Sequence, residues 1–218
     1  MATVRSHLSV PAGFIPRARP LPWWKRSIDV AVSAVGLVLL APFFGLVAIV
    51  VRLDSAGSAF FGQERMGANG STFICWKFRS MHQDAEAQAP LLAARNQANG
   101  LIFKMKDDPR RTRVGKVLRK TSIDELPQLW NVLRGEMSLV GPRPPLPSEV
   151  ERYEPEHWAR LRGVPGITGL WQVRARHRHD FTEMLEMDLE YLEDISPVND
   201  LRILLLTIPA VLMARGSH

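Results

Sequence analysis

Residues 23–52 read WWKRSIDVAVSAVGLVLLAPFFGLVAIVVR, and residues 30–51 within this stretch contain no charged side chain. At about 1.5 Å per residue, a helix of this length matches the roughly 30 Å hydrocarbon core of a bilayer. The Trp-Trp-Lys-Arg sequence of residues 23–26 combines aromatic and cationic side chains that favour a membrane interface. The stretch therefore predicts a membrane helix.

Pro42 lies near the middle of this run, where it removes a backbone hydrogen bond and kinks or breaks a helix. Cations flank both ends of the run, so neither end has the positive bias that orients a spanning helix. They are Arg17, Arg19, Lys25 and Arg26 before it, and Arg52, Arg65, Lys77 and Arg79 after it. Two topologies stay open: an ordinary span, which tolerates proline, and a re-entrant helix that bends at Pro42 and returns to the same face.

The composition describes a folded, basic protein. The 218 residues suffice for one compact domain, or for a membrane anchor with a domain of about 165 residues. A hydrophobic content of 46% excludes a disordered basic tail. Residues 180–194 hold seven carboxylates and no Lys or Arg, which leaves the rest of the chain at +13 and suited to an anionic partner. The one cysteine, Cys75, excludes an internal disulfide or a zinc cluster.

Beyond residue 52 the pattern changes to short segments. Residues 59–65 and 72–78 are alternating or aromatic-rich, and the turn-forming residues 67–70 between them predict a β-hairpin. Residues 101–105 predict a further strand.

Helical spacing dominates the second half of the chain. We expect a helix from Arg113 and a helix over 124–134 that ends at Gly135. Residues 181–195 form an amphipathic stripe whose acidic face is expected to point to solvent. Residues 203–213 are apolar but too short to span a bilayer, which predicts an interfacial helix.

Two isolated groups invite chemical interpretations. His177 and His179 could hold a metal through two ring nitrogens, but without a third ligand type nearby a surface or phosphate-contacting role is favoured. Cys75 lies in an apolar strand, where a buried packing thiol is favoured over a nucleophile.

The densest chemical signal is a basic cluster, residues 104–120, with eight Lys or Arg. Asp124 and Glu125 follow it at the start of a predicted helix, where unpaired N–H groups favour anions. One interpretation is structural: Ser122 and Glu125 form a capping box and Asp124 is a first-turn acid. The other is catalytic, because carboxylates among cations beside a membrane anchor suit an enzyme that handles a phosphorylated lipid.

Residues 119–144, RKTSIDELPQLWNVLRGEMSLVGPRP, closely resemble the signature of the bacterial sugar transferases, the monotopic polyprenyl-phosphate hexose-1-phosphate transferases or phosphoglycosyl transferases. The resemblance extends to KRSID at 25–29, KFRSM at 77–81 and PGITGLWQV at 165–173, and covers nearly everything after residue 23.

This resemblance implies a mostly helical α+β fold in the family's minimal catalytic form, at the cytoplasmic face of the bacterial inner membrane. The implied segments are a Pro/Arg-rich arm at 1–22, a re-entrant membrane helix at 23–52 bent at Pro42, a catalytic domain at 53–200 and an interfacial C-terminal helix and tail at 201–218. Family members often bend at Ser-Pro, whereas this chain has Ala41-Pro42.

The resemblance also implies a reaction. A sugar-1-phosphate passes from a UDP-sugar, of galactose or glucose type, to undecaprenyl phosphate with release of UMP, which starts exopolysaccharide or glycan assembly. Asp124 matches the nucleophile that forms a covalent phosphosugar intermediate, and Glu125 matches its partner at Mg²⁺, for which Asp124 is a second candidate ligand. A homodimer is plausible.

The expected substrate-binding residues are mostly cations. They are Arg119, Arg143 within the Pro142-Arg-Pro144 motif, Lys77 and Arg79. A structural role for Arg143, paired with Glu136, is the alternative.

A function of a different class also stays open. A non-enzymatic membrane-bound adaptor could use its basic body to bind anionic lipid or nucleic acid, although the sequence contains nothing that resembles a nucleic-acid module. Such an adaptor would need no Mg²⁺ and would release no UMP.

Overall fold

The computed structural model describes residues 17–92, 96, 101, 105, 107–175 and 180–212. After the long helix α1 (Trp23–Asp54), it contains a set of short elements. The strands are β1 (Phe60–Met66), β2 (Thr72–Phe78), β3 (Ser138–Val140) and β4 (Gly166–Thr168). The helices are α2 (Ala85–Leu92), α3 (Arg113–Lys120), α4 (Leu129–Arg134), α5 (Pro147–Val150), α6 (Leu170–Arg174), α7 (Phe181–Glu193) and α8 (Pro197–Leu212). The 3-10 helices are η1 (Ala68–Gly70), η3 (Ile123–Gln128) and η4 (Pro155–Arg162). The α+β, mostly helical prediction is confirmed.

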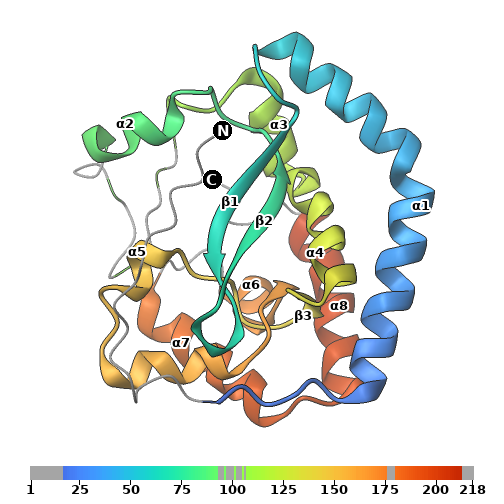
Figure 1. Cartoon of the computed structure of the whole chain (residues 1–218), viewed down its shortest axis with the longest axis vertical. Coiled ribbons are helices and arrows are strands. Elements are labelled where there is room, and N and C mark those ends of the chain that lie inside the picture. Colours follow the sequence, from blue (N-terminus) through green and yellow to red (C-terminus); the bar gives the residue numbers. More distant parts are fainter. Residues whose placement is uncertain are drawn as a thin grey trace.

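Helix α1 contains 32 residues and curves along one side of the molecule (Figure 1). In the described part of the chain it is the one helix long and apolar enough to cross a membrane. Most of its apolar side chains lie on the surface, and Val38 and Leu39 are more than 70% exposed. The chain stays helical through Pro42, and the helix curves along its length without a break.

The N-terminal end of α1 is bound to the rest of the fold by a polar stripe. Lys25, Asp29 and Ser33 recur every four residues and are buried. The ammonium of Lys25 pairs with Asp200 of α8, and Asp29 Oδ1 accepts a hydrogen bond of 2.9 Å from the backbone N–H of Leu139.

The C-terminal end of α1 is bound to the same folded body. Asp54 Oδ2 accepts a 3.0 Å hydrogen bond from the N–H of Val114 at the start of α3. The buried guanidinium of Arg79 donates to the carbonyls of Ser55 and Ala56, directly after the helix. Both ends of the apolar helix therefore contact one domain.

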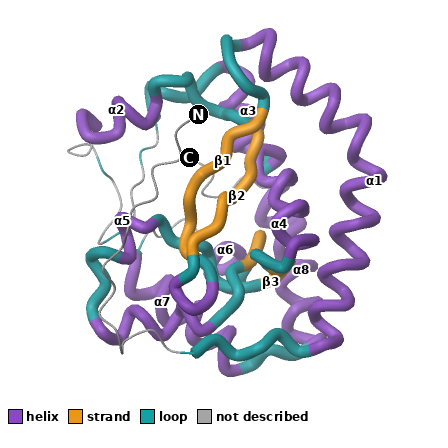
Figure 2. Tube along the Cα trace, in the orientation of Figure 1, coloured by secondary structure: helices purple, strands orange, loops and turns teal. Residues whose placement is uncertain are grey.

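The β1–β2 hairpin confirms the sequence prediction. Its strands are antiparallel, with Gln63 opposite Cys75. Helix α4 covers the outer edge of β2, because Asn131 accepts from the N–H of Trp76 at 3.0 Å and donates to the carbonyl of Ile74 at 2.6 Å. Figure 2 shows the hairpin in the middle of the view, with α4 and then α1 outward on one side.

A second, parallel pair of three-residue strands, β3 and β4, was not predicted. Their backbones approach so closely that a Cβ on Gly166 would lie 2.1 Å from the backbone nitrogen of Gly141. Glycine at both positions allows the approach, and the pair fixes the loop that follows β3.

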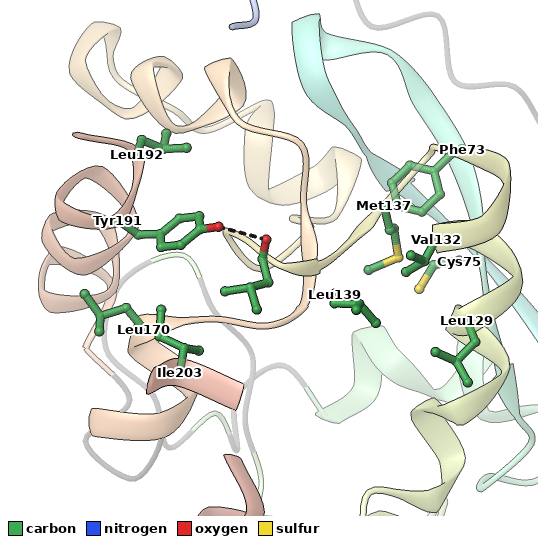
Figure 3. Packing of buried hydrophobic residues seen from close by; sticks show 11 residues of the cluster. Phe73, Cys75, Leu129, Val132, Met137, Leu139, Leu170, Tyr191, Leu192 and Ile203 are labelled. Carbon is green, nitrogen blue, oxygen red and sulfur yellow. Dashed lines mark hydrogen bonds between the residues drawn. The ribbon is translucent and has the colours of Figure 1, made fainter. Parts of the chain in front are cut away.

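The main core lies between the hairpin, α4, β3, α7 and α8. Its members include Phe73, Cys75, Leu129, Val132, Met137, Leu139, Leu170, Tyr191, Leu192 and Ile203 (Figure 3). The hydroxyl of Tyr191 lies 3.1 Å from the carbonyl of Val140 and 2.8 Å from Asp200. The core thus reaches the buried end of α1.

Three helical predictions need correction. The helix predicted over 124–134 is a 3-10 helix followed by α4, because Pro127 cannot donate a backbone hydrogen bond within it; Gly135 ends it as expected, at φ +84°. The acidic face of α7 is not wholly exposed, since Asp188 is buried. The predicted helix over 203–213 begins earlier, as α8, at Pro197. The strand predicted at 101–105 lies largely outside the described residues.

Candidate functional site

Asp124 and Glu125 lie together in η3, which packs against β2. Asp124 is 7% exposed, whereas Glu125 is partly exposed. The structural alternative, a capping box of Ser122 and Glu125, does not form: Ser122 adopts a left-handed conformation, φ +55°, and its side chain makes no capping bond. This conformation is uncommon for residues other than glycine, and such residues cluster at active sites and ligand-binding segments.

Lys77 reaches Glu125 from β2. The Lys77 ammonium lies 2.7 Å from Glu125 Oε1, and both side chains are about three-quarters buried. Alternation along the strand puts Lys77 on the same face as Cys75 and Phe73, toward the core and η3. The hairpin thus orients one carboxylate of the pair.

Arg119, in the last turn of α3, is electrostatically coupled to the carboxylate pair. Burial lowers the pKa of Arg119, and the negative charge of Asp124 acts in the opposite direction. Arg111 and Asp108 also act on it, and Asp108 is held by Arg110 through two guanidinium contacts of 2.9 and 2.7 Å. The basic cluster is therefore locally organised around carboxylates.

Arg65 of β1 belongs to the site, although the sequence indicated only a flanking cation. Burial and the charge of Arg143 lower the pKa of Arg65 to about 10, while Glu149 and Glu125 act to raise it. Its Nη1 donates to the carbonyl of Pro144 at 2.9 Å. Arg65 thus lies within electrostatic reach of both Arg143 and Glu125.

One signal for Arg65 was present in the sequence. Residues 61, 63 and 65 of the predicted hairpin share a face with residue 77 if the strands pair in register. The register itself could not be read from the sequence, so the alternation alone did not connect Arg65 to Lys77.

Arg143 pairs with Glu149, not with Glu136 as the structural alternative proposed. Two parallel contacts of 3.0 and 3.2 Å join the guanidinium to the carboxylate. Burial acts to raise the pKa of Glu149, but the charge and hydrogen bonds of Arg143, the charge of Arg65 and the N–H of Leu146 together lower it. Glu136 instead contacts Arg134 and Asn131.

The remaining predicted residues lie at different places in the structure. Pro142 and Pro144 are buried on either side of Arg143. Arg79 is not brought to the carboxylate pair by any described contact, and its guanidinium binds the chain after α1. Burial raises the pKa of the Cys75 thiol, as expected of a packing cysteine. His177 and His179 lie outside the described residues.

Adjacent carboxylates at Asp124 and Glu125 are a donor set that Mg²⁺ accepts together with phosphate oxygens. A second group of possible ligands, Glu154, Glu156 and His157, lies in η4 and the residue before it. It is largely exposed, and His157 Nδ1 already accepts a 3.1 Å hydrogen bond from the N–H of Glu154. The pair in η3 is therefore the stronger candidate.

Comparison with known proteins gives consistent results. The profile of the bacterial sugar transferase family matches residues 21–214. The galactosyl transferase CpsE of Streptococcus agalactiae serotype III is 46% identical over 198 residues, covering 88% of this chain and 43% of that protein. The exopolysaccharide production protein ExoY of Sinorhizobium fredii is 43% identical, and the match covers 89% of this chain and 88% of that protein. An undecaprenyl-phosphate galactose phosphotransferase of Salmonella typhimurium is 40% identical, and the match covers 89% of this chain and 41% of that protein. The chain thus spans less than half of two relatives and most of the third.

Proposed function

Because this chain belongs to the bacterial sugar transferase family, we propose that it transfers a hexose-1-phosphate from a UDP-sugar to undecaprenyl phosphate and releases UMP. Two of the relatives above are named for galactose transfer, which favours UDP-galactose as donor, with UDP-glucose as the second candidate. The reaction would start the assembly of an exopolysaccharide or another glycan.

One observation carries this proposal: a buried aspartate stands beside a lysine-paired glutamate, and Arg119 is electrostatically coupled to both carboxylates. Asp124 is 7% exposed, and Lys77 contacts Glu125. Cations at this density suit a diphosphate, and a carboxylate among them is placed to attack phosphorus.

The proposed chemistry has two balanced steps. A carboxylate oxygen of Asp124 attacks the β-phosphorus of the UDP-sugar, and the bond from that phosphorus to the bridging oxygen breaks. UMP leaves with the electron pair, and the sugar phosphate stays on Asp124 as an acyl phosphate. A phosphate oxygen of undecaprenyl phosphate then attacks the same phosphorus, and the Asp124 carboxylate is regenerated. Covalent catalysis lets a soluble nucleotide and a membrane lipid react at different times.

Mg²⁺ fits the donor set of Asp124 and Glu125, and when bound it would neutralise diphosphate charge and make UMP a better leaving group. The chain's own residues prepare the site. Lys77 holds the Glu125 carboxylate at 2.7 Å. Arg143, fixed by Glu149, can direct its remaining N–H groups at phosphate oxygens.

The contacts of α1 support a re-entrant topology. Its N-terminal end binds α8 and β3 through Lys25 and Asp29, and its C-terminal end binds α3 through Asp54. A spanning helix would put these ends on opposite sides of about 30 Å of hydrocarbon, yet a single domain contacts both. We therefore propose that α1 enters and leaves the inner membrane at the cytoplasmic face, and that the exposed apolar side chains of α8 lie in the interface.

The function is tested by measuring UMP release from a panel of UDP-sugars. The full chain in membranes is supplied with Mg²⁺ and undecaprenyl phosphate, and each donor is also tested without the lipid. Lipid-dependent turnover with UDP-galactose or UDP-glucose is expected. If a folded preparation is silent toward every donor, the transferase proposal fails and the adaptor hypothesis gains support.

A further inference from the structure

The loop that carries Arg143 is held at four consecutive backbone carbonyls. Three of its four residues, 142–145, are prolines, which have no backbone N–H, so the carbonyls are its main backbone hydrogen-bonding groups. Each carbonyl accepts from a different donor: Pro142 from the Gly166 N–H at 2.9 Å, Arg143 from Arg160 Nη2 at 3.1 Å, Pro144 from Arg65 Nη1 at 2.9 Å, and Pro145 from the Met66 N–H at 2.9 Å. The position of Arg143 is thus fixed from β1, β4 and η4 together.

The donor to the Arg143 carbonyl is itself held in place. Arg160 is 1% exposed. Its guanidinium contacts the Asp188 carboxylate of α7 and donates to the hydroxyl of Tyr153 at 2.8 Å. Asp188 is 2% exposed. A fully buried charge pair therefore contacts the backbone of Arg143, the residue that is proposed to bind substrate.

Stability alone does not account for this pair. Removing two charges from water costs about as much as their attraction returns, and apolar replacements of similar volume are often neutral or stabilising. Arg160 Nε is also buried with no hydrogen-bond partner in the described part of the chain. An apolar pair would fill the space, but it would not donate to the Arg143 carbonyl.

We propose that Arg160 and Asp188 are positioning residues for Arg143. Asp188 orients Arg160, Arg160 fixes the Arg143 carbonyl, and Glu149 fixes the Arg143 guanidinium through contacts of 3.0 and 3.2 Å. The backbone carbonyl of Arg143 is then held through Arg160 and Asp188, and its guanidinium is held by Glu149. The N–H groups of Arg143 that do not contact Glu149 are therefore fixed in direction. This inference rests on the proposed function, in which Arg143 binds the phosphates or the nucleotide of the donor.

The test replaces the buried pair by apolar residues. The double variant Arg160→Met/Asp188→Leu leaves no unpaired charge, so we expect a folded protein. We expect kcat/KM for UMP release to fall about 10- to 100-fold, because small displacements of a substrate-binding group are costly. The melting temperature is measured on the same preparations. Wild-type kcat/KM in the folded double variant would overturn the proposal.

A double-mutant cycle separates positioning from general disruption. Arg143→Gln is made alone and together with Arg160→Met/Asp188→Leu. If the pair acts through Arg143, the combined variant has a kcat/KM within about twofold of Arg143→Gln alone. If the two losses multiply, the pair acts elsewhere and the proposal is wrong.

Two further variants complete the design. Arg174→Gln/Glu190→Gln removes an exposed ion pair that also involves α7, and it is expected to leave kcat/KM unchanged. Arg160→Lys keeps the charge opposite Asp188 but lacks the planar fork; if the apolar variant does not fold, this variant carries the same cycle with the same criteria. A wild-type preparation that is silent toward every donor would overturn the proposed function and this inference with it, whereas an active wild type with multiplying losses overturns the inference alone.

Discussion

Lys77 is the residue through which the hairpin acts on the carboxylate pair. Its ammonium lies 2.7 Å from Glu125, and the two side chains are comparably buried. This contact orients the Glu125 carboxylate toward β2.

Replacing Lys77 tests this role. We expect Lys77→Gln to lower kcat/KM for UMP release about 10- to 100-fold, the range found when a group that orients a metal-binding or catalytic side chain is lost. Lys116→Gln is the matched control, because Lys116 belongs to the same basic cluster and is exposed. Equal effects of the two substitutions would mean that overall charge, not the Glu125 contact, matters.

Glu149 provides a pH test. Burial acts to raise the pKa of Glu149, but the charge and hydrogen bonds of Arg143, with the charge of Arg65 and the Leu146 N–H, lower it below its unfolded value of 4.5. The stabilisation is therefore complete above about pH 4.5 and is lost as the pH falls through the native pKa. We expect Glu149→Gln to reduce the free energy of unfolding by about 1–3 kcal/mol at pH 7 and by less at pH 3.

The comparison is made by denaturant unfolding in detergent micelles, with the exposed Glu151→Gln as control. A difference between wild type and Glu149→Gln that stays constant from pH 7 to pH 3 would refute the assignment.

At the residue scale, a continuous motif was easier to predict than a partner distant in sequence. Asp124 and Glu125 were found because they lie next to each other within one signature. The pairing of Arg143 with Glu149 was missed, because choosing Glu149 over Glu136 requires the direction of the loop after β3. The strained Ser122 was also missed, since serine at a helix start ordinarily predicts a cap.

Helix α3 illustrates how elements position the site. Thr112 caps it by accepting from the N–H of Gly115 at 2.9 Å. A Cβ on Gly115 would lie 2.0 Å from the carbonyl oxygen of Ser80, so the helix packs directly on the chain after β2. This contact sets where Arg119 lies relative to the hairpin.

Two helical glycines make a matched pair for testing it. We expect Gly115→Ala to lower the free energy of unfolding by about 1–3 kcal/mol or more, because the backbone segments on both sides cannot move apart easily. Gly45 in α1 has nothing within 4 Å of an added Cβ, so Gly45→Ala is expected to be neutral or to stabilise by up to about 1 kcal/mol. Equal melting temperatures for the two variants would contradict the packing described for α3.

The hairpin and the start of α3 at Arg113 were predictable because alternation and helical spacing are local properties. The parallel β3–β4 pair was not, because three residues are too few to show a period and the partners lie far apart in the sequence. The burial of Asp188 was hidden for the same reason: its partner Arg160 lies on another element.

At the scale of the whole molecule, α1 binds one domain at both of its ends, which leads to a topology test. In a Cys75→Ala background, single cysteines replace Arg17 and Ala56, which are exposed just before and just after α1. We expect a membrane-impermeant maleimide to label neither cysteine in intact cells and both after the inner membrane is opened. Labelling of only one of them in intact cells would show a spanning helix.

The central claim is that Asp124 carries the sugar phosphate, and intact-protein mass measurement tests it directly. The purified full chain is incubated with Mg²⁺ and the donor identified from the panel, without undecaprenyl phosphate. We predict a mass increase of one hexose phosphate and the release of at most one UMP per protein molecule. The adduct should disappear when undecaprenyl phosphate is added. Asp124→Asn should show no adduct, while Asp107→Asn, at an exposed acid, should behave as wild type. An adduct that persists in Asp124→Asn, or lipid-dependent turnover by that variant at the wild-type rate, would contradict the account.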